Sequence, residues 1–299
     1  GHLAVVDVEP EGVEREGIDE HREPRCVAER VEPLRSLAPH LIELVAEEEL
    51  QGRRGLLPAD GDEPGDGRPT DAPEQVLEVS VDSLTHFGEP YDGSTRYFKP
   101  TLFMAAVRAA LGEASVLHGV DEMPPKIGIT EEQVLRALGA RTTLSLEEAA
   151  TLIEDPEVGF AYVSQREFAP GAYGIRELRV HIKKRPPWAA TEKAQQLFSA
   201  PGANYMVIGY FHIGYEEPLL QLIWERSFQA GLVVKGEEGT SHYALRLGTP
   251  STAERQAVNY SQGFRRVNGR REDFALDIDP AGFGFHHEKH PRLESVSPD

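Results

Sequence analysis

Cysteine is almost absent from this sequence of 299 residues, since Cys26 is the only one, and no disulfide can form within the chain. The sequence also lacks an apolar run long enough to span a bilayer and a hydrophobic segment of the kind found in signal peptides. These absences exclude a disulfide-stapled scaffold and a membrane-embedded protein. We therefore expect a soluble, cytoplasmic protein with no membrane partner.

Basic residues are scarce relative to acidic ones. The chain has 31 lysines and arginines against 50 aspartates and glutamates, which gives a formal net charge of −19 and a pI near 5.0. Because a field of this sign repels the phosphate backbone, we expect no nucleic-acid partner. The acidic excess is greatest near the amino terminus, where residues 1–75 carry 20 acidic and 8 basic side chains.

The first 75 residues differ in composition from the rest of the chain. Residues 51–73 are rich in Gly, Pro and Asp and poor in apolar side chains, which is typical of disorder. Residues 39–50 carry leucines at helical spacing. We predict that residues 1–75 form an acidic, partly disordered leader with a partial helical segment, and a compact helical subdomain is the alternative. The main domain is predicted over 76–285, followed by a tail at 286–299.

From residue 76 onward, short apolar runs alternate with helical segments. The apolar runs predict strands at 76–81, 115–117, 159–163, 205–209 and 231–235. The helical segments lie at 101–111, 131–138, 145–153, 191–198 and 216–229. Strands that alternate with helices in this way predict an α/β fold with a central mixed or parallel sheet flanked by helices.

Two of the predicted helices begin with the same local signal. Thr130 is followed three residues later by Gln133, and Ser145 is followed in the same way by Glu148. This spacing is that of a capping box, in which each side chain bonds the backbone N–H of the other. Gly139 then ends the first of these helices.

The stretch 88–128 is the strongest candidate for a binding site. A glycine-containing loop at 88–100 leads into the helix that begins near Thr101, whose unpaired N–H groups could bind a phosphate. Asp92 in this loop could hold a metal ion or a ribose hydroxyl. The alternative is an ordinary connection between a strand and a helix.

Two polar residues follow the next predicted strand. His118, with Gly119 beside it, stands at the end of the strand, where open α/β sheets bind ligands. Lys126 comes eight residues after His118 and follows two prolines that should hold its loop rigid. The alternative is that His118 is a polar residue satisfied at a strand end.

A basic run at 181–188 stands out in so acidic a chain. Arg185 is its best candidate for binding a carboxylate or a phosphate through two hydrogen bonds. A solvated sheet edge is the alternative, and a nucleic-acid site ranks lower because of the overall charge. His286 and His290 have the spacing of metal ligands, but the residue after His286 is not the Glu of a zinc-protease helix.

At these residues the chain resembles the anthranilate phosphoribosyltransferase family, in a divergent form, over about 76–247. The family's glycine-rich loop, Gly-Thr-Gly-Gly-Asp-Gly, corresponds to 88–93, and its Asn-Ile-Ser-Thr motif corresponds to 98–101. Its His-Gly-Asn motif corresponds to 118–120, and its Ser-Ser-Lys-Ser-Gly motif to 124–128.

The resemblance implies transfer of phosphoribose from phosphoribosyl pyrophosphate to a small, aromatic amine acceptor, as in tryptophan biosynthesis, with Mg²⁺ as cofactor. It implies a small-molecule substrate and leaves a homodimer open. The residues implied to bind the phosphate and pyrophosphate groups are Gly88, Asp92, Gly93, Thr101, Lys126 and Gly128. Those implied to line the acceptor side are His118, Gly119 and Arg185.

The sequence departs from the family pattern at one important place. The Asp-Glu pair that would hold magnesium falls within Thr240, Ser241 and His242, so the metal ligands are not defined. A non-catalytic protein that binds a phosphate-bearing ligand and has lost metal-dependent chemistry is therefore the alternative function.

Overall fold

The computed structural model describes residues 76–183, 185, 188–226, 228–243, 259–278 and 283–284. The predictions made for residues 1–75, for Cys26 and for the histidines at 286–290 lie outside these residues. None of the described helices is long and apolar enough to cross a bilayer.

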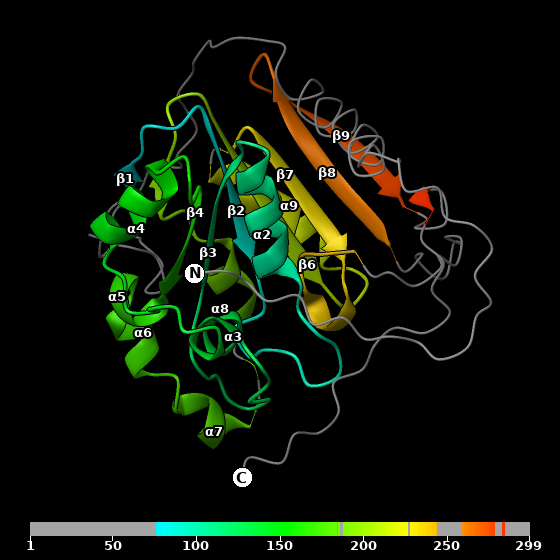
Figure 1. The fold of residues 1–299 in the computed structure, drawn as a ribbon. Helices are drawn as coiled ribbons and strands as arrows, with labels where there is room; N and C mark the ends of the chain where they lie inside the picture. The colour runs from blue at the N-terminus through cyan, green and yellow to red at the C-terminus, as the bar shows by residue number, and fades with distance from the viewer. Residues whose placement is uncertain are drawn as a thin grey trace, which may run out of the picture. The chain divides into compact units, whose positions relative to one another are not determined.

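A seven-stranded mixed sheet forms the centre of the fold (Figure 1). Its strand order is β4-β3-β2-β6-β7-β8-β9. The first five strands in this order pair in parallel, and the pairs β7-β8 and β8-β9 are antiparallel. The strands are β2 Ser83–Gly88, β3 Ala114–Gly119, β4 Phe160–Ser164, β6 Ala203–Tyr210, β7 Ala230–Lys235, β8 Tyr260–Val267 and β9 Arg270–Asp277. The predicted α/β class with a mixed sheet is confirmed.

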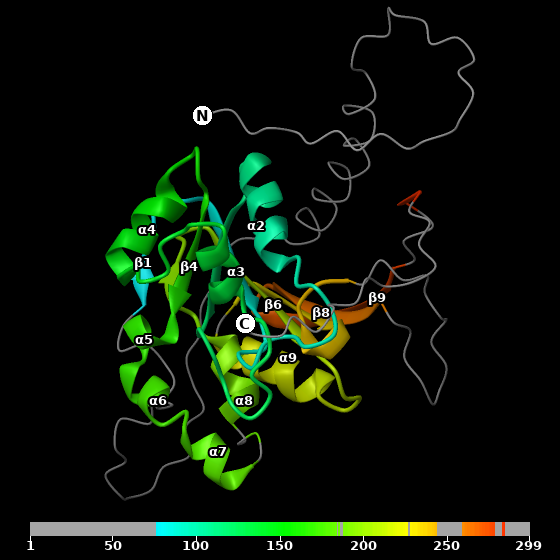
Figure 2. The same cartoon turned by 60° about the horizontal axis from the view of Figure 1, so that its bottom comes forward.

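Helices cover both faces of the sheet. The helices are α2 Thr101–Ala110, α3 Glu131–Ala137, α4 Leu146–Glu154, α5 Gln165–Phe168, α6 Pro170–Gly174, α7 Leu178–Ile182, α8 Trp188–Thr191 and α9 Glu216–Glu225, with 3₁₀ turns η1 Glu192–Ala194 and η2 Glu237–Gly239. Consecutive residues of a strand point to opposite faces. In β6, Met206 and Ile208 pack with α9, whereas Val207 packs with the residues beneath α2. Figure 2 shows α2 and α9 on opposite sides of these strands.

The local helix signals are confirmed. Thr130 and Ser145 are the N-caps of α3 and α4, and each forms the predicted capping box with Gln133 or Glu148. Gly139 has a φ of 82°, in the left-handed region that a helix end requires. These contacts depend on residues three or four positions apart, which explains why the sequence alone predicts them.

The first predicted strand, at 76–81, is largely wrong. Only Leu77–Glu78 forms a strand, β1, which pairs with β5 Phe198–Ser199 in a separate two-stranded sheet. The central strand is instead β2, whose polar residues conceal its burial in the sequence. His86 of β2 is fully buried, and its two ring nitrogens lie 3.1 and 3.3 Å from the carbonyl oxygens of Phe198 and Tyr205.

The predicted helix at 191–198 is also wrong. The chain there ends α8, forms the η1 turn and then extends into β5. The carbonyl oxygen of Leu197 accepts a hydrogen bond from the backbone of Leu77 at 3.1 Å, and that of Ser199 accepts one from Val79 at 3.0 Å. Pairing with a strand more than 100 residues away therefore outweighs local helix propensity.

The antiparallel hairpin of β8 and β9 was not predicted. No residue of β9 is buried and only part of β8 is, so the hairpin lacks the continuous apolar run of the buried parallel strands. Phe264 of β8 is fully buried against α9 and β7, where it contacts Ile223 and Val233 within one apolar cluster. The hairpin therefore extends the sheet at the edge that follows β7.

Candidate functional site

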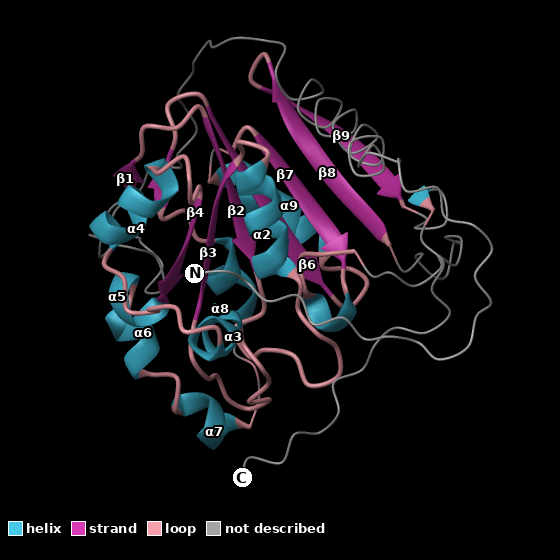
Figure 3. Ribbon diagram, in the orientation of Figure 1, coloured by secondary structure: helices cyan, strands magenta, loops and turns pink. Residues whose placement is uncertain are grey.

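A cavity lies at the carboxyl edge of the parallel strands. The loops that follow β2, β6 and β7 meet there (Figure 3) because parallel strands end at the same edge of a sheet. Its volume is about 460 Å³. It is lined by Pro90, Tyr91, Asp92, Arg179, Arg185, Ala189, Ala190, Glu192, Lys193, Tyr210, Phe211, His212, Tyr215, Leu219, Glu238 and Gly239.

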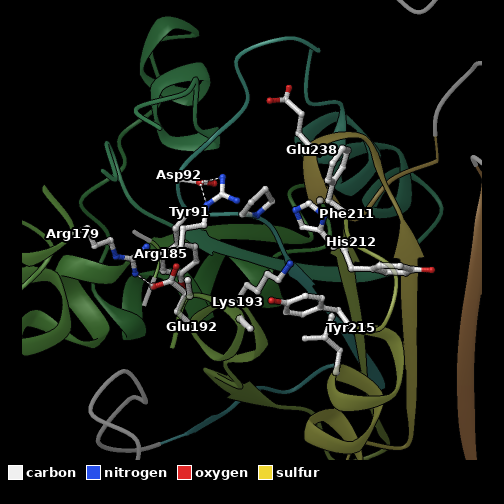
Figure 4. Close-up of a pocket in the computed structure, with 16 residues that line it drawn as sticks. Tyr91, Asp92, Arg179, Arg185, Glu192, Lys193, Phe211, His212, Tyr215 and Glu238 are labelled. Atoms are coloured by element: carbon white, nitrogen blue, oxygen red, sulfur yellow. Dashed lines mark hydrogen bonds and ion pairs between the residues drawn. The ribbon is translucent and has the colours of Figure 1, made fainter. Parts of the chain in front are cut away.

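Lys193 reaches into the middle of this cavity, between the arginines on one side and Phe211 and His212 on the other (Figure 4). Its ammonium donates a hydrogen bond to the carbonyl oxygen of Gly209, and no carboxylate of the described residues lies within ion-pair distance of it. Burial lowers the pKa of Lys193 to about 8, against the opposing charges of nearby carboxylates. A cation that is largely desolvated in this way favours an anionic ligand group beside it.

The two arginines of the cavity already have carboxylate partners. Nε of Arg185 lies 2.6 Å from Oδ2 of Asp92, and Arg179 is paired with Glu192. The structure thus brings together Asp92 and Arg185, which the sequence placed in the same site. It does so by pairing them with each other, so the positive charge of Arg185 is not free for a ligand.

A site that binds a negatively charged group adjoins the cavity, and we call it the anion cradle. It consists of the backbone N–H groups of Thr95, Arg96 and Tyr97 and the ammonium of Lys126. These donors converge on the carboxylate of Glu238, with distances of 3.1, 2.9 and 3.2 Å from the amides and 2.8 Å from Lys126. Burial raises the pKa of Glu238, but the bonds from Lys126 and the amides outweigh it and lower the pKa to about 2.

A buried cluster of charges lies behind the loop that forms the cradle. Lys99 contacts Glu131 at 2.6 Å and Glu89 at 3.5 Å, and all three side chains are at most 5% exposed. Glu89 also accepts hydrogen bonds from Thr101 at 2.9 Å and from the backbone of Ser241 at 2.7 Å. The predicted phosphate ligand Thr101 is therefore fully buried and bonded within the protein.

The predicted acceptor residue His118 does not line the cavity. It is buried behind Tyr91, whose hydroxyl oxygen lies 2.6 Å from its Nδ1. Burial, aided by the charges of His86 and Arg226, lowers the pKa of His118 to about 3, so the ring is neutral. The next residue, Gly119, faces the hydroxyl of Tyr162. His118 can therefore act on a ligand only by positioning Tyr91, which does line the cavity.

The glycines predicted to approach a phosphate instead allow backbones of this chain to approach each other. A Cβ at Gly88 would collide with the carbonyl oxygen of Lys193. A Cβ at Gly93 would collide with the backbone of Gly128, and a Cβ at Gly128 would collide with that of Gly93. The amide of Gly128 donates to the carbonyl oxygen of Asp92 at 2.8 Å. These glycines thus hold the loops around the site in place.

Gly209 allows the turn that carries Glu238 to approach β6, and replacing it tests this close approach. A Cβ at Gly209 would collide with the carbonyl oxygen of Thr240. Gly209→Ala should lower the free energy of unfolding by about 1–3 kcal/mol, measured by urea unfolding followed by circular dichroism. The control is Gly171→Ala, where a Cβ meets open space. Equal effects of the two substitutions would contradict the close approach.

The described residues do not provide a side-chain site for a metal ion. Among them, no group of three or more His, Cys, Asp or Glu side chains is placed to hold one. Ser241 and His242 stand where the resemblance would put an acidic pair, and Glu89, the nearest carboxylate to Ser241, is already bonded to Ser241, Thr101 and Lys99. The part of the chain that the structure describes therefore does not fit Mg²⁺ held by carboxylates, and we derive no step through that ion.

Several residues of the site were not found from the sequence. Lys193 fell within a helix that does not form, and Glu238 carries no local signal, since its partners lie more than 100 residues earlier. Tyr210 is the last residue of β6, a strand that was predicted correctly, and the aromatic residues Phe211 and Tyr215 follow it. The position of aromatic residues after that strand was the one signal that could have identified them.

Comparisons with known proteins found partial similarity to anthranilate phosphoribosyltransferases. No protein-family model matches the chain. Among curated proteins, the anthranilate phosphoribosyltransferase of Rubrobacter xylanophilus is 28% identical over 137 residues, which cover 45% of this chain and 38% of that protein. The chain thus matches less than half the length of this relative.

Solved structures of the anthranilate phosphoribosyltransferase of Saccharomyces cerevisiae are also similar. The complex with PRPP and Mg is 13% identical, with a TM-score of 0.49 over 73% of this chain and 55% of the other. The complex with 4-fluoroanthranilate is 13% identical, with a TM-score of 0.47 over 73% of this chain and 54% of the other.

Proposed function

We propose that this chain, which is 28% identical over 137 residues to a curated anthranilate phosphoribosyltransferase, transfers a phosphoribosyl group from phosphoribosyl pyrophosphate to a small aromatic amine. The observation that carries the proposal is that an anion site and an aromatic, cation-containing cavity adjoin at the same sheet edge. Glu238 belongs to both, since its carboxylate fills the anion cradle and its side chain lines the cavity.

The donor would bind with its phosphate groups at the anion cradle. Three backbone N–H groups and the ammonium of Lys126 converge there, and charge-assisted hydrogen bonds to phosphate are among the strongest that proteins make. The same groups would stabilise the pyrophosphate as negative charge accumulates on it in the transition state. Of the residues predicted to bind phosphate, Lys126 keeps this role in our proposal, and Gly93 and Gly128 shape the loops beside it.

The acceptor would bind in the cavity. Tyr210, Phe211 and Tyr215 give it aromatic walls, and Lys193 supplies a cation without a carboxylate partner among the described residues. The acceptor amine would form a bond to C1 of the ribose as the bond from C1 to the pyrophosphate oxygen breaks, and the amine proton would pass to solvent. Catalysis would then depend mainly on holding the two substrates side by side.

Lys193→Met tests the role of this cation in the acceptor site. Removing one charge-assisted hydrogen bond costs about 1.5–3 kcal/mol, so kcat/KM for an acidic aromatic amine should fall about 10- to 100-fold. Product formation is followed by mass spectrometry with phosphoribosyl pyrophosphate and anthranilate. The control is Lys183→Met, which changes an exposed lysine that does not line the cavity. Equal rates for the two variants would exclude Lys193 from the acceptor site.

A non-catalytic protein that binds a phosphate-bearing ligand is the second candidate. The absence of a metal-holding side-chain cluster among the described residues favours it. A panel of aromatic amines separates the two functions. Binding of phosphoribosyl pyrophosphate without product from any amine, with Mg²⁺ present, would favour the non-catalytic protein, and a new C–N product would favour the transferase.

A further inference from the structure

The carboxylate of Glu238 occupies the anion cradle as an oxyanion ligand would. Its two oxygens accept hydrogen bonds from three consecutive amides, from the hydroxyl of Thr95 and from Lys126, and its side chain is 1% exposed. Consecutive N–H groups that converge with an ammonium form a typical site for phosphate. A phosphate group offers more oxygens and more negative charge than a carboxylate, so the same donors would bind it more strongly.

The turn that carries Glu238 has an unfavourable backbone conformation. Glu238 has a φ of 56°, in the left-handed region that residues with a Cβ rarely adopt. Such a conformation persists where the surrounding contacts hold it, and here those contacts are the bonds to the cradle. If the carboxylate left the cradle, the η2 turn would lose the interactions that hold it.

The same turn forms part of the cavity wall. Glu238 and Gly239 line the cavity together with Tyr91 and Asp92, which follow β2. Movement of the turn would therefore change the shape of the cavity at the place where it meets the cradle. Occupation of the cradle by a ligand and access to the cavity are linked through one short segment.

We propose that Glu238 is an internal competitor for the phosphate group, and that a phosphoryl oxyanion entering the cradle displaces the η2 turn and opens the cavity toward the cradle. The inference rests on the proposed function for the identity of the ligand, since it concerns the same anion site. It adds a self-occupied state in which this chain holds its own phosphate site closed.

The test uses inorganic pyrophosphate and isothermal titration calorimetry on the full chain. Glu238→Ala removes the competitor and should bind pyrophosphate at least 10-fold more tightly than the unaltered chain. Glu237→Ala is the matched control, because it removes the same charge from the same turn, and its affinity should stay within about twofold. Adding Lys126→Ala to Glu238→Ala should abolish the gain.

Two results would overturn the inference. One is that the folded Glu238→Ala variant binds pyrophosphate no more tightly than the unaltered chain does, or that neither protein binds pyrophosphate. The other is an equal gain in Glu237→Ala, which would assign the effect to net charge. The test needs no amine acceptor and no turnover, so it can fail while phosphoribosyl transfer is observed, and the reverse.

Hydrogen exchange on the unaltered chain gives a second measurement that does not depend on a variant folding. With saturating pyrophosphate, the amides of residues 236–241 should exchange faster, because the turn is released. The amides of residues 95–97 should stay protected, because the oxyanion replaces the carboxylate as their acceptor. Unchanged exchange in 236–241 at saturation would contradict the displacement.

Discussion

Replacing Lys99 by methionine should lower the free energy of unfolding by about 3–5 kcal/mol at neutral pH, because it leaves buried carboxylates without their cation. Burial lowers the pKa of Lys99, but Glu131 and Glu89 outweigh burial and hold the pKa above its usual value, so the lysine is charged. The ammonium lies 2.6 Å from Glu131 and 3.5 Å from Glu89. Urea unfolding followed by circular dichroism measures the effect.

The matched control is Arg141→Met. Arg141 also pairs with a glutamate, Glu148, but both side chains are exposed, at 60% and 45%. An exposed pair contributes about 0–1 kcal/mol, so this variant should be nearly as stable as the unaltered chain. If Lys99→Met were no more destabilising than Arg141→Met, the buried cluster would not hold the loops of the site together.

The stability of the protein should fall in mild acid, and three buried groups determine by how much. Burial lowers the pKa of His86 to about 4 although two backbone carbonyls oppose it, and burial lowers the pKa of His118 to about 3. Burial also raises the pKa of Glu131 to about 7, with Lys99 opposing and the charge of Glu89 adding to the rise.

The signs of these contributions differ. Below pH 6.5 the unfolded chain protonates both histidines while the folded chain does not, so stability present above pH 6.5 is lost as the pH falls. Folded Glu131 takes up its proton below about pH 7 and the unfolded one only below about 4.5, so this group adds stability as the pH falls through that window. From pH 6.5 to 5.0, each histidine lowers the free energy of unfolding by about 1–2 kcal/mol, and Glu131 raises it by about 1–2 kcal/mol.

The unaltered chain should therefore lose about 1–2 kcal/mol of unfolding free energy between pH 6.5 and pH 5.0, and Glu131→Gln should lose about 3 kcal/mol over the same interval. Urea unfolding at the two pH values measures both changes, at low protein concentration because the pI is near 5.0. A smaller loss in Glu131→Gln than in the unaltered chain would contradict the protonation states assigned to the buried groups.

What could be predicted from the sequence were features that depend on near neighbours in the chain. The caps at Thr130 and Ser145 and the helix α2 between Pro100 and Gly112 lie where the local signals place them. The apolar strand β7 was equally clear. The helix expected at 191–198 failed because its residues pair with β1, and no local signal records a partner so far away in sequence.

The roles assigned to the candidate site residues stay predictions, but the structure shows where three of them lie. Asp92, Lys126 and Arg185 do come to one edge of the sheet, as the order of strands and loops indicated. Each is held by a partner within the chain. Lys126 pairs with the carboxylate of Glu238, and Arg185 pairs with the carboxylate of Asp92. Which charges neutralise each other depends on contacts between residues about 90 or more apart, so only the structure shows that Lys193 has no carboxylate partner among the described residues.

Titration of phosphoribosyl pyrophosphate into the full chain by isothermal calorimetry tests whether the anion cradle binds the donor. We expect one binding event per chain, weakened at least 10-fold in Lys126→Ala and strengthened in Glu238→Ala, because both substitutions act at the anion cradle. A folded chain that releases or absorbs no heat with phosphoribosyl pyrophosphate, with and without Mg²⁺ and in all three proteins, would contradict it.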